Sequence, residues 1–482
     1  MTTVTPQTVP TAPGGVPVLG HLPALLHDPL GFLGSLARVG DAVEISLGPR
    51  RMTVVTSPAL VHTLLTALSH DCPRGTVQGA LREAFGDGLL MSEGALHRER
   101  RRAVQPAFTA ERVAALAGVV GEAARERIER WSPGRAVDVA GEMTALALDV
   151  VARALFGVRL AEGPAAAFRR ALPDLVRGQI ARSLCPHPLF ARLPLPLNRR
   201  FDAAVRVLDA VVDRTVGGPD GPDGRDRPYG RDRPDGRDGA PAGPLRDAVD
   251  PATGRRLDRA ALRSEAVSLF GAGTETVSST LTWLFHELMG APEVYARLLG
   301  ELEEAYGDGL TGAASGEPGA GWPGEAPPYL RAVLREVLRL HAPNAFLTRT
   351  AAAGVRLGPY AVPAGTELLY SLTALHRDPA RYPDPLRFDP DRWADGEGAG
   401  DRRLFLPFGA GRHKCVGEGF AWMELAVIAA TVLLRWRLAP LPGARAREVV
   451  WTTVQARDVV MTVAPRAVRV PGPPGASAGG AP

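Results

Sequence analysis

The chain has 482 residues and a formal net charge of +4, and 45% of its residues are hydrophobic while 22% are charged. This balance is close to ordinary globular usage, so it excludes a fibrous repeat and wholesale disorder. The arginines are scattered among acidic residues rather than gathered in a basic stripe, so we expect no nucleic-acid partner.

The predicted elements follow a disordered N-terminus over residues 1–15. Asp28 with Pro29, and Ser57 with Pro58, are N-cap pairs that each start a helix. Apolar periodicity predicts long helices at about 110–131, 258–289, 329–341 and 416–436, and shorter strands at 42–47, 52–56, 355–357 and 367–370. The pattern indicates a mainly α protein with a small β sheet, of class α+β.

Low-complexity segments interrupt this pattern but do not divide the chain into separate domains. Residues 217–244 carry a Gly/Pro/Arg/Asp near-repeat, which favours a loop insertion over an interaction tract. Residues 307–328 are Gly-rich and typical of a long surface loop, and residues 467–482 predict a disordered tail. We therefore expect one domain over residues 16–466.

The cysteine count and the termini bear on location. Cys72, Cys185 and Cys415 are too few for a disulfide framework, and they suit a reducing cytoplasm. The first twenty residues lack the basic start and apolar stretch of a signal peptide, and no apolar run approaches the ~18 residues of a membrane span. The prediction is a cytoplasmic protein with no membrane anchor.

The sharpest motif is the ten-residue stretch from Phe408 to Gly417, which brings Cys415 to the start of an apolar helix. Glycines at 409 and 411 let the backbone approach a flat ligand, and the positive end of the helix dipole favours a thiolate. A lone cysteine is more often a small buried core residue. The complete pattern argues against that alternative.

That stretch resembles the cysteine loop of the cytochrome P-450 family, Phe-Gly-x-Gly-x-His/Arg-x-Cys-x-Gly, at every defined position. The resemblance extends over most of the chain. It implies the cytochrome P-450 fold with a single haem domain, haem b (iron protoporphyrin IX) as cofactor, and Cys415 as the thiolate ligand of the iron. Phe408, Gly409, His413 and Gly417 are the accompanying cofactor-binding positions.

Two further motifs match the family. Glu336 and Arg339 lie three apart on one helix face, where they can pair. A lone Glu-x-x-Arg is commonplace, but the resemblance implies that Arg392 joins them in a buried structural triad behind the haem. The stretch Ala272-Gly-Thr-Glu275-Thr276 lies in the 258–289 helix and resembles the oxygen-activation motif. Ala272 would leave space beside the cofactor, Thr276 would hold O2 and an ordered water, and Glu275 would relay protons.

The haem propionates have their own candidate partners. His97 and Arg101 lie four apart on one helix face and match a family segment that grips a propionate, although many relatives carry Trp at the position of His97. Arg349 and His413 match two further propionate contacts. Each of these side chains taken alone is more often a surface charge.

The resemblance implies a haem-thiolate monooxygenase that inserts one atom of O2 into a C–H bond of a lipophilic small molecule. Electrons would come from NAD(P)H through a ferredoxin and a ferredoxin reductase, since only 67 residues follow Cys415 and a fused reductase is not expected. The protein is expected to be a monomer. Asn198-Arg-Arg-Phe-Asp and Thr282-Trp-Leu-Phe-His-Glu-Leu look like bacterial terpene-oxidising members, which favours a terpenoid of secondary metabolism.

Several alternatives stay open from the sequence. The substrate is a terpenoid, or else a fatty acid, polyketide or macrolide. A haem-thiolate peroxygenase or isomerase would not need O2 activation, and the pair Glu275 and Thr276 argues against it. A non-catalytic haem sensor or electron carrier would need neither pocket nor proton relay, and a purely structural helical protein would carry five matched motifs by accident.

Overall fold

The structure is a computed structural model of the chain. It describes residues 7–466 except 77–81, 185–187, 218–244, 246–247, 250–252, 308–324, 395–404 and 451–452. The predicted disorder of 467–482, the insertion at 217–244 beyond Gly217, and residues 308–324 of the predicted loop at 307–328 therefore lie outside the described residues.

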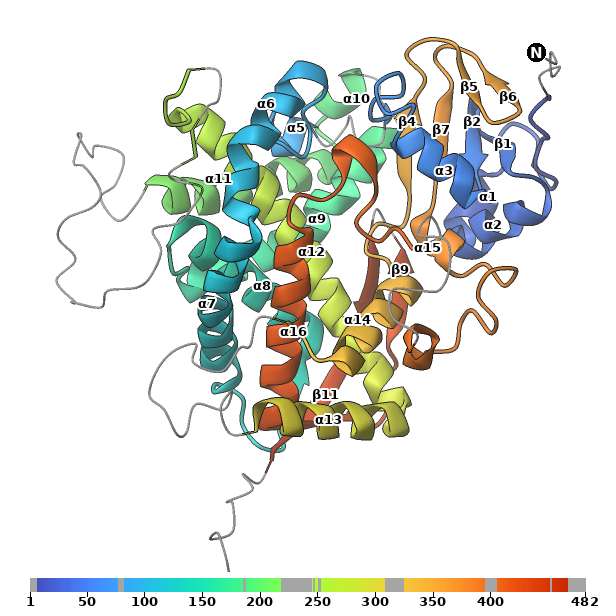
Figure 1. The fold of residues 1–482 in the computed structure, drawn as a ribbon. Helices are drawn as coiled ribbons and strands as arrows, with labels where there is room; N and C mark the ends of the chain where they lie inside the picture. Colours follow the sequence, from blue (N-terminus) through green and yellow to red (C-terminus); the bar gives the residue numbers. More distant parts are fainter. Residues whose placement is uncertain are drawn as a thin grey trace, which may run out of the picture.

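Helices dominate the described part of the chain, and α12 runs through its middle beside α16 (Figure 1). The α-helices and their bounds are α1 (Leu22–His27), α2 (Pro29–Ser35), α3 (Pro58–Leu65), α5 (Arg82–Phe85), α6 (Gly94–Val104), α7 (Ala110–Ile128), α8 (Val139–Phe156), α9 (Glu162–Leu184), α10 (Pro188–Arg192), α11 (Pro196–Gly217), α12 (Arg259–Gly290), α13 (Pro292–Tyr306), α14 (Pro328–Leu340), α15 (Leu372–His376) and α16 (Glu418–Arg435). Short 3-10 turns lie at Leu36–Arg38, Gln105–Phe108, Pro390–Trp393 and Gly411–His413.

The four long helices predicted from periodicity are confirmed as α7, α12, α14 and α16, within a few residues at each end. At α12 the Asp258 side chain accepts a hydrogen bond from the Ala261 N–H at 2.8 Å, which caps the first turn. At α2 the Asp28 side chain accepts one from the Gly31 N–H at 2.9 Å. The helix starts predicted at Pro29 and Pro58 are also confirmed.

The strands form small sheets, as expected. They are β1 (Ala42–Leu47), β2 (Arg50–Val55), β3 (Ala136–Asp138), β4 (Leu347–Thr350), β5 (Val355–Leu357), β6 (Tyr360–Val362), β7 (Glu367–Tyr370), β8 (Trp436–Pro440), β9 (Arg447–Val450), β10 (Val454–Arg457) and β11 (Val460–Pro465). The largest sheet has the order β1-β2-β7-β4, with β2 and β7 parallel. It lies at one side of the molecule, against α1, α2 and α3 (Figure 1).

The core follows the central helices. One apolar cluster joins α7, α8, α12, α14 and α16, and a second joins α8, α9 and α11 to the first half of α12. The first half of α12 belongs to one cluster and its second half to the other, so the helix is packed before and after its middle. That middle contains residues 272–276, so the fold fixes the segment on which the oxygen-activation motif was predicted.

The N-terminal segment differs from the prediction. Residues 7–15 were expected to be disordered, yet the Gln7 N–H donates to Pro359 O at 3.0 Å and the Ala12 N–H donates to Glu44 O at 2.9 Å. Ala12 is buried. These contacts join residues far apart in sequence, which composition does not reveal. Among the described residues, no helix combines the length and hydropathy that a membrane crossing requires.

Candidate functional site

The cysteine loop connects the 3-10 turn at Gly411–His413 to α16. The Cys415 N–H donates to Phe408 O at 3.0 Å, which closes the loop, and the Phe408 ring lies 5.5 Å from that of Trp422. Gly411 has φ +69°, and a Cβ there would lie 2.0 Å from Leu65 O. Glycine is therefore required where the loop crosses α3. Gly417 is the N-cap of α16.

Cys415 is accessible at the turn that leads into α16. Its surroundings raise the pKa of the thiol, because the desolvation effect outweighs the opposing hydrogen bond from the Gly417 N–H and the charges of Arg101 and Lys414. The thiolate that the sequence predicted at this helix end stays a prediction. A bound metal ion deprotonates a coordinating thiol, so the thiolate depends on the metal.

Polar side chains from several elements gather beside this loop. The His97 and His413 rings lie 4.4 Å apart, and His413 Nε2 lies 3.1 Å from Glu93 Oε2. Arg74 Nη1 donates to Glu93 Oε1 at 3.0 Å. Burial, with the charges of His413 and Arg74, lowers the pKa of His97 to about 3, so His97 is a neutral hydrogen-bonding group.

Arg349 adds unpaired donors to this cluster. It lies on β4, pairs through its backbone with Arg74, and is only 6% exposed. Its Nε and Nη1 are buried without a hydrogen-bond partner in the described part of the chain. A buried guanidinium with unused donors is costly unless an anion completes it. The cluster thus fits the carboxylates of a haem, next to a loop that presents a cysteine.

Arg101 contacts the cysteine loop directly. Its Nη1 donates to the main-chain oxygens of Arg412 at 3.2 Å and Lys414 at 2.7 Å. These bonds tie α6 to the cysteine loop on both sides of His413. The observed contacts of Arg101 are therefore to the loop backbone, and its contact with a propionate stays a prediction.

The predicted oxygen-activation motif lies in the middle of α12. Thr276 Oγ1 donates to Ala272 O at 2.7 Å, one turn earlier. Phe270, just before the motif, and Val416, just after Cys415, belong to or pack against the same apolar cluster. Residues next to the motif and next to Cys415 thus belong to the surroundings of one apolar cluster. Glu275 accepts hydrogen bonds from Thr453 Oγ1 and Gln455 Nε2, both at 2.5 Å.

Glu336, Arg339 and Arg392 come together at α14. Arg339 Nε and Nη2 donate to the two Glu336 carboxylate oxygens at 2.9 and 2.8 Å, and Arg392 Nε donates to Glu336 Oε1 at 3.3 Å. Arg339 Nη1 also donates to His376 O and Pro385 O, both at 2.8 Å. These bonds fasten α14 to the segment that precedes the cysteine loop.

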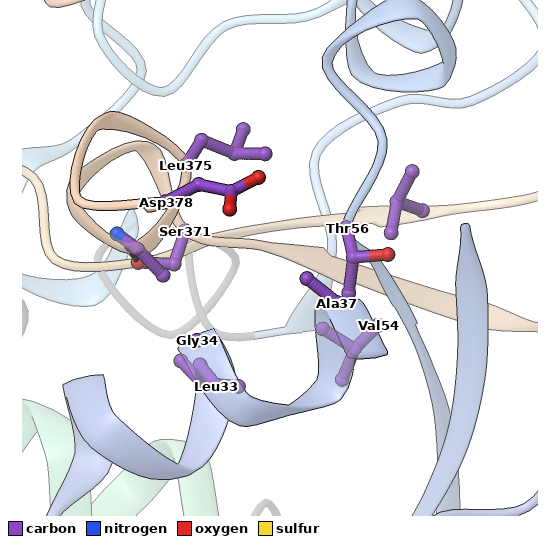
Figure 2. Close-up of a pocket in the computed structure, with 10 residues that line it drawn as sticks. Leu33, Gly34, Ala37, Val54, Thr56, Ser371, Leu375 and Asp378 are labelled. Carbon is purple, nitrogen blue, oxygen red and sulfur yellow. Dashed lines mark hydrogen bonds between the residues drawn. The ribbon is translucent and has the colours of Figure 1, made fainter. Parts of the chain in front are cut away.

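A separate cavity lies between α2, β2 and the segment around α15 (Figure 2). Its polar residues are already engaged, since Ser371 Oγ donates to Ala345 O and Asp378 Oδ2 accepts from Arg381. Apolar side chains such as Leu33 and Val54 form much of the remaining wall. This cavity is distinct from the cluster around Cys415, and we assign it no chemistry.

Sequence reasoning missed several residues of the site. Arg74 and Glu93 connect His413 to β4, Trp393 Nε1 donates to Glu336 Oε2 at 3.0 Å, and Thr453 and Gln455 bind Glu275. Trp393 directly follows Arg392, which was the one available signal. The others carry no local motif, because their partners lie far away in the sequence.

The fold and site define a class of protein. A helical core, a glycine-shaped loop that presents one cysteine, and unpaired buried donors beside it suit an anionic cofactor bound through sulfur. A family model described as Cytochrome P450 matches residues 10–452. The chain belongs to the cytochrome P450 family and is a haem-thiolate monooxygenase that uses O2 and electrons from redox partners.

Three curated relatives are similar over nearly the whole chain. They are cyclooctat-9-en-7-ol 5-monooxygenase of Streptomyces melanosporofaciens, 39% identical over 91% of both chains, and cyclooctatin synthase of the same organism, 35% identical over 94% of this chain and 95% of the relative. Pentalenene oxygenase of Streptomyces avermitilis is 32% identical over 92% and 94%. The crystal structure of the cytochrome P450DA heme domain superposes with TM-score 0.76 and 24% identity, over 96% of this chain and 99% of that one, which confirms the fold.

Proposed function

We propose that this monooxygenase inserts one oxygen atom from O2 into a C–H bond of a terpenoid in secondary metabolism. The observation that carries the proposal is the similarity, at 39% identity over 91% of both chains, to an enzyme named for oxidation of cyclooctat-9-en-7-ol. A second relative is named for pentalenene. Both names specify terpenoid compounds, so this substrate class is favoured over a fatty acid, polyketide or macrolide.

We assign haem b to the space between the cysteine loop and α12. Cys415 would ligate the iron, with Phe408, Gly409 and Gly417 shaping the loop and Ala272 facing the cofactor from α12. His97, Arg101, Arg349 and His413 would bind the propionates, and the two unpaired nitrogens of Arg349 support this role most directly. Glu336, Arg339 and Arg392 would keep the loop in place from behind.

When bound, a haem with a thiolate ligand would favour cleavage of the O–O bond of O2, because the sulfur donates electron density to the iron. The chain's own residues would control the protons. The Thr276 hydroxyl donates a hydrogen bond to Ala272 O in this structure, and it would turn to hold O2 and an ordered water. Glu275 would pass protons inward from solvent.

An apolar wall supports a lipophilic substrate. Phe85 and Leu89 are buried, and Phe85 packs directly on Gly271, one residue before Ala272. Apolar walls with few polar groups suit hydrocarbon ligands.

We further propose that the electrons come from NAD(P)H through a ferredoxin and its reductase. We also propose that the protein is a monomer and that it lies in the cytoplasm.

The proposal is tested by titrating the ferric holoenzyme with cyclooctat-9-en-7-ol and pentalenene, and with palmitate as the fatty-acid comparison. A substrate that enters the pocket displaces water from the iron, and the absorption spectrum then shifts. We expect a saturable shift and an oxygenated product with at least one terpenoid. Turnover of palmitate without a shift from either terpenoid would contradict the substrate class.

The proton roles are tested separately with Thr276→Ala. Loss of the hydroxyl is expected to send a larger share of the consumed O2 to hydrogen peroxide, while haem content stays unchanged. Thr282→Val is the matched control, since Thr282 Oγ1 makes the same kind of bond, to Ser278 O at 2.6 Å, elsewhere on α12. Equal peroxide yields from the two variants would contradict the role of Thr276.

A further inference from the structure

The carboxyl group of Glu275 is held by a strand that is distant in sequence. Thr453, and Gln455 on β10, both donate to Glu275 Oε1 at 2.5 Å. Both donors therefore meet the same oxygen. In the described part of the chain, the other oxygen, Oε2, has no hydrogen bond. The hairpin β9–β10 thus fixes one end of the carboxyl and leaves the other available.

Arg457 determines which end of the Gln455 amide faces Glu275. Arg457 Nη2 donates to Gln455 Oε1 at 3.2 Å. A guanidinium can only donate, so it selects the amide oxygen and turns the amide nitrogen toward Glu275. The same nitrogen also lies 3.1 Å from Thr453 Oγ1. Arg457 therefore donates to Gln455, and Gln455 and Thr453 both donate to the Glu275 carboxyl.

The strand does not need these side chains to stay on α12. Val454 O accepts hydrogen bonds from Ser279 Oγ at 2.6 Å and Trp283 Nε1 at 3.2 Å, both from α12. The Val454 side chain is also buried in the main core cluster. The contacts of Thr453 and Gln455 with Glu275 are therefore additional to those that dock β10.

We propose that Gln455, oriented by Arg457, and Thr453 are positioning residues that hold Glu275 Oε1 so that Oε2 carries the relayed proton. The inference rests on the proton role given to Glu275 under the proposed function. In each transfer the O–H bond at Oε2 breaks, its proton passes to a water on the Thr276 side, and Oε2 takes up another proton from solvent. The carboxyl ends each cycle in its starting state.

The electrostatics of Glu275 agree with this arrangement. Burial raises its pKa, while the hydrogen bonds from Thr453 and Gln455 and the charge of Arg457 act in the opposite direction. Among the described residues, Arg457 is the charged group that acts on this carboxyl. The hairpin therefore favours the anionic form, which the surroundings on α12 alone would oppose.

Infrared spectroscopy of the ferric holoenzyme measures the protonation of the Glu275 carboxyl directly, without a substrate. The protonated-carboxyl band that Glu275→Gln removes belongs to Glu275, and its pH titration gives the midpoint. Hydrogen bonds to a charged group contribute about 1.5–3 kcal/mol, so Gln455→Leu is expected to raise the midpoint by ~1 to 2 pH units. Arg457→Leu should raise it by less. Ser279→Ala, which removes a docking bond only, should leave it unchanged.

A midpoint in Gln455→Leu equal to that of Ser279→Ala, in protein with full haem content, would overturn the proposal. Absence of any band sensitive to Glu275→Gln at all accessible pH would mean that the carboxyl stays ionised, and would also overturn it. A failure of the proposed proton role of Glu275 would give a different result. If Gln455→Leu moves the midpoint but Glu275→Gln leaves the solvent isotope effect on O2 consumption unchanged, the positioning holds and the relay role of Glu275 is wrong.

Discussion

Glu336 and Arg339 form a two-bond ion pair in which both side chains are 0% exposed. Each carboxylate oxygen accepts one guanidinium donor, and Arg392 and Trp393 add further donors to the same carboxylate. A buried pair of this kind is weak evidence for net stability, but removal of one partner leaves the other charged and unpaired.

Glu336→Gln is therefore expected to destabilise the holoprotein by about 3 to 5 kcal/mol and to lower haem incorporation. Chemical unfolding and the haem-to-protein absorbance ratio measure the two effects. Glu325→Gln is the matched control, because Glu325 pairs with Arg331 at the surface with 86% of its side chain exposed. That change should cost less than about 1 kcal/mol. A cost for Glu336→Gln as small as that of the control would contradict the triad.

Arg349→Gln is expected to weaken haem retention. Its two unpaired buried nitrogens fit carboxylates, and charge-assisted hydrogen bonds contribute about 1.5–3 kcal/mol, so haem should leave roughly ten- to a hundredfold faster. Transfer of haem to apomyoglobin measures the rate. Arg356→Gln, at an exposed position on β5, supplies the comparison. Equal rates for both variants would exclude Arg349 from propionate binding.

Glu265 makes stability depend on pH. It is 0% exposed, the Leu89 N–H donates to its Oε2 at 2.9 Å, and Arg100 lies 3.6 Å from Oε1. Burial raises its pKa from 4.5 to about 7, against those two groups. The folded state thus binds the proton more tightly than the unfolded chain, so this contribution is complete below pH 4.5 and is lost as pH rises through 7.

Between pH 4.5 and 8, the unfolding free energy of the wild type should fall by about 3 kcal/mol relative to Glu265→Gln. Parallel urea unfolding of both proteins gives this difference, because other titrating groups cancel. A difference that stays constant over this range would show that burial does not raise the pKa of Glu265.

Gly271 provides the space for Phe85. A Cβ at position 271 would lie 2.0 Å from Phe85 Cε1, so Gly271→Ala is expected to cost about 1–3 kcal/mol through overpacking. In the double variant with Phe85→Ala this overpacking term should vanish, which a double-mutant cycle from thermal unfolding measures. Gly290→Ala on the same helix meets nothing within 4 Å and should be nearly neutral. Additive costs would show that the cost of Gly271→Ala does not come from the Phe85 ring.

Local patterns made much of this molecule predictable. The helices that became α7, α12, α14 and α16 were predicted because their apolar periodicity is long and regular. The cysteine loop was predictable because all its parts lie within ten residues. The family and the fold followed from these local features.

What the sequence did not reveal depends on contacts between distant segments. Glu93 lies 320 positions before His413, with which it pairs, and Gln455 lies 180 positions after Glu275. Residues 7–15 are ordered by backbone bonds to Glu44 and Pro359, although their composition favours disorder.

The most direct test of the account is the absorption spectrum of the dithionite-reduced holoprotein under carbon monoxide, compared with that of Cys415→Ser. Thiolate ligation predicts a strongly red-shifted Soret band in the wild type and its loss in the variant. A well-folded, haem-loaded wild type without this band would show that Cys415 does not ligate the iron, which would contradict the proposed site and its chemistry.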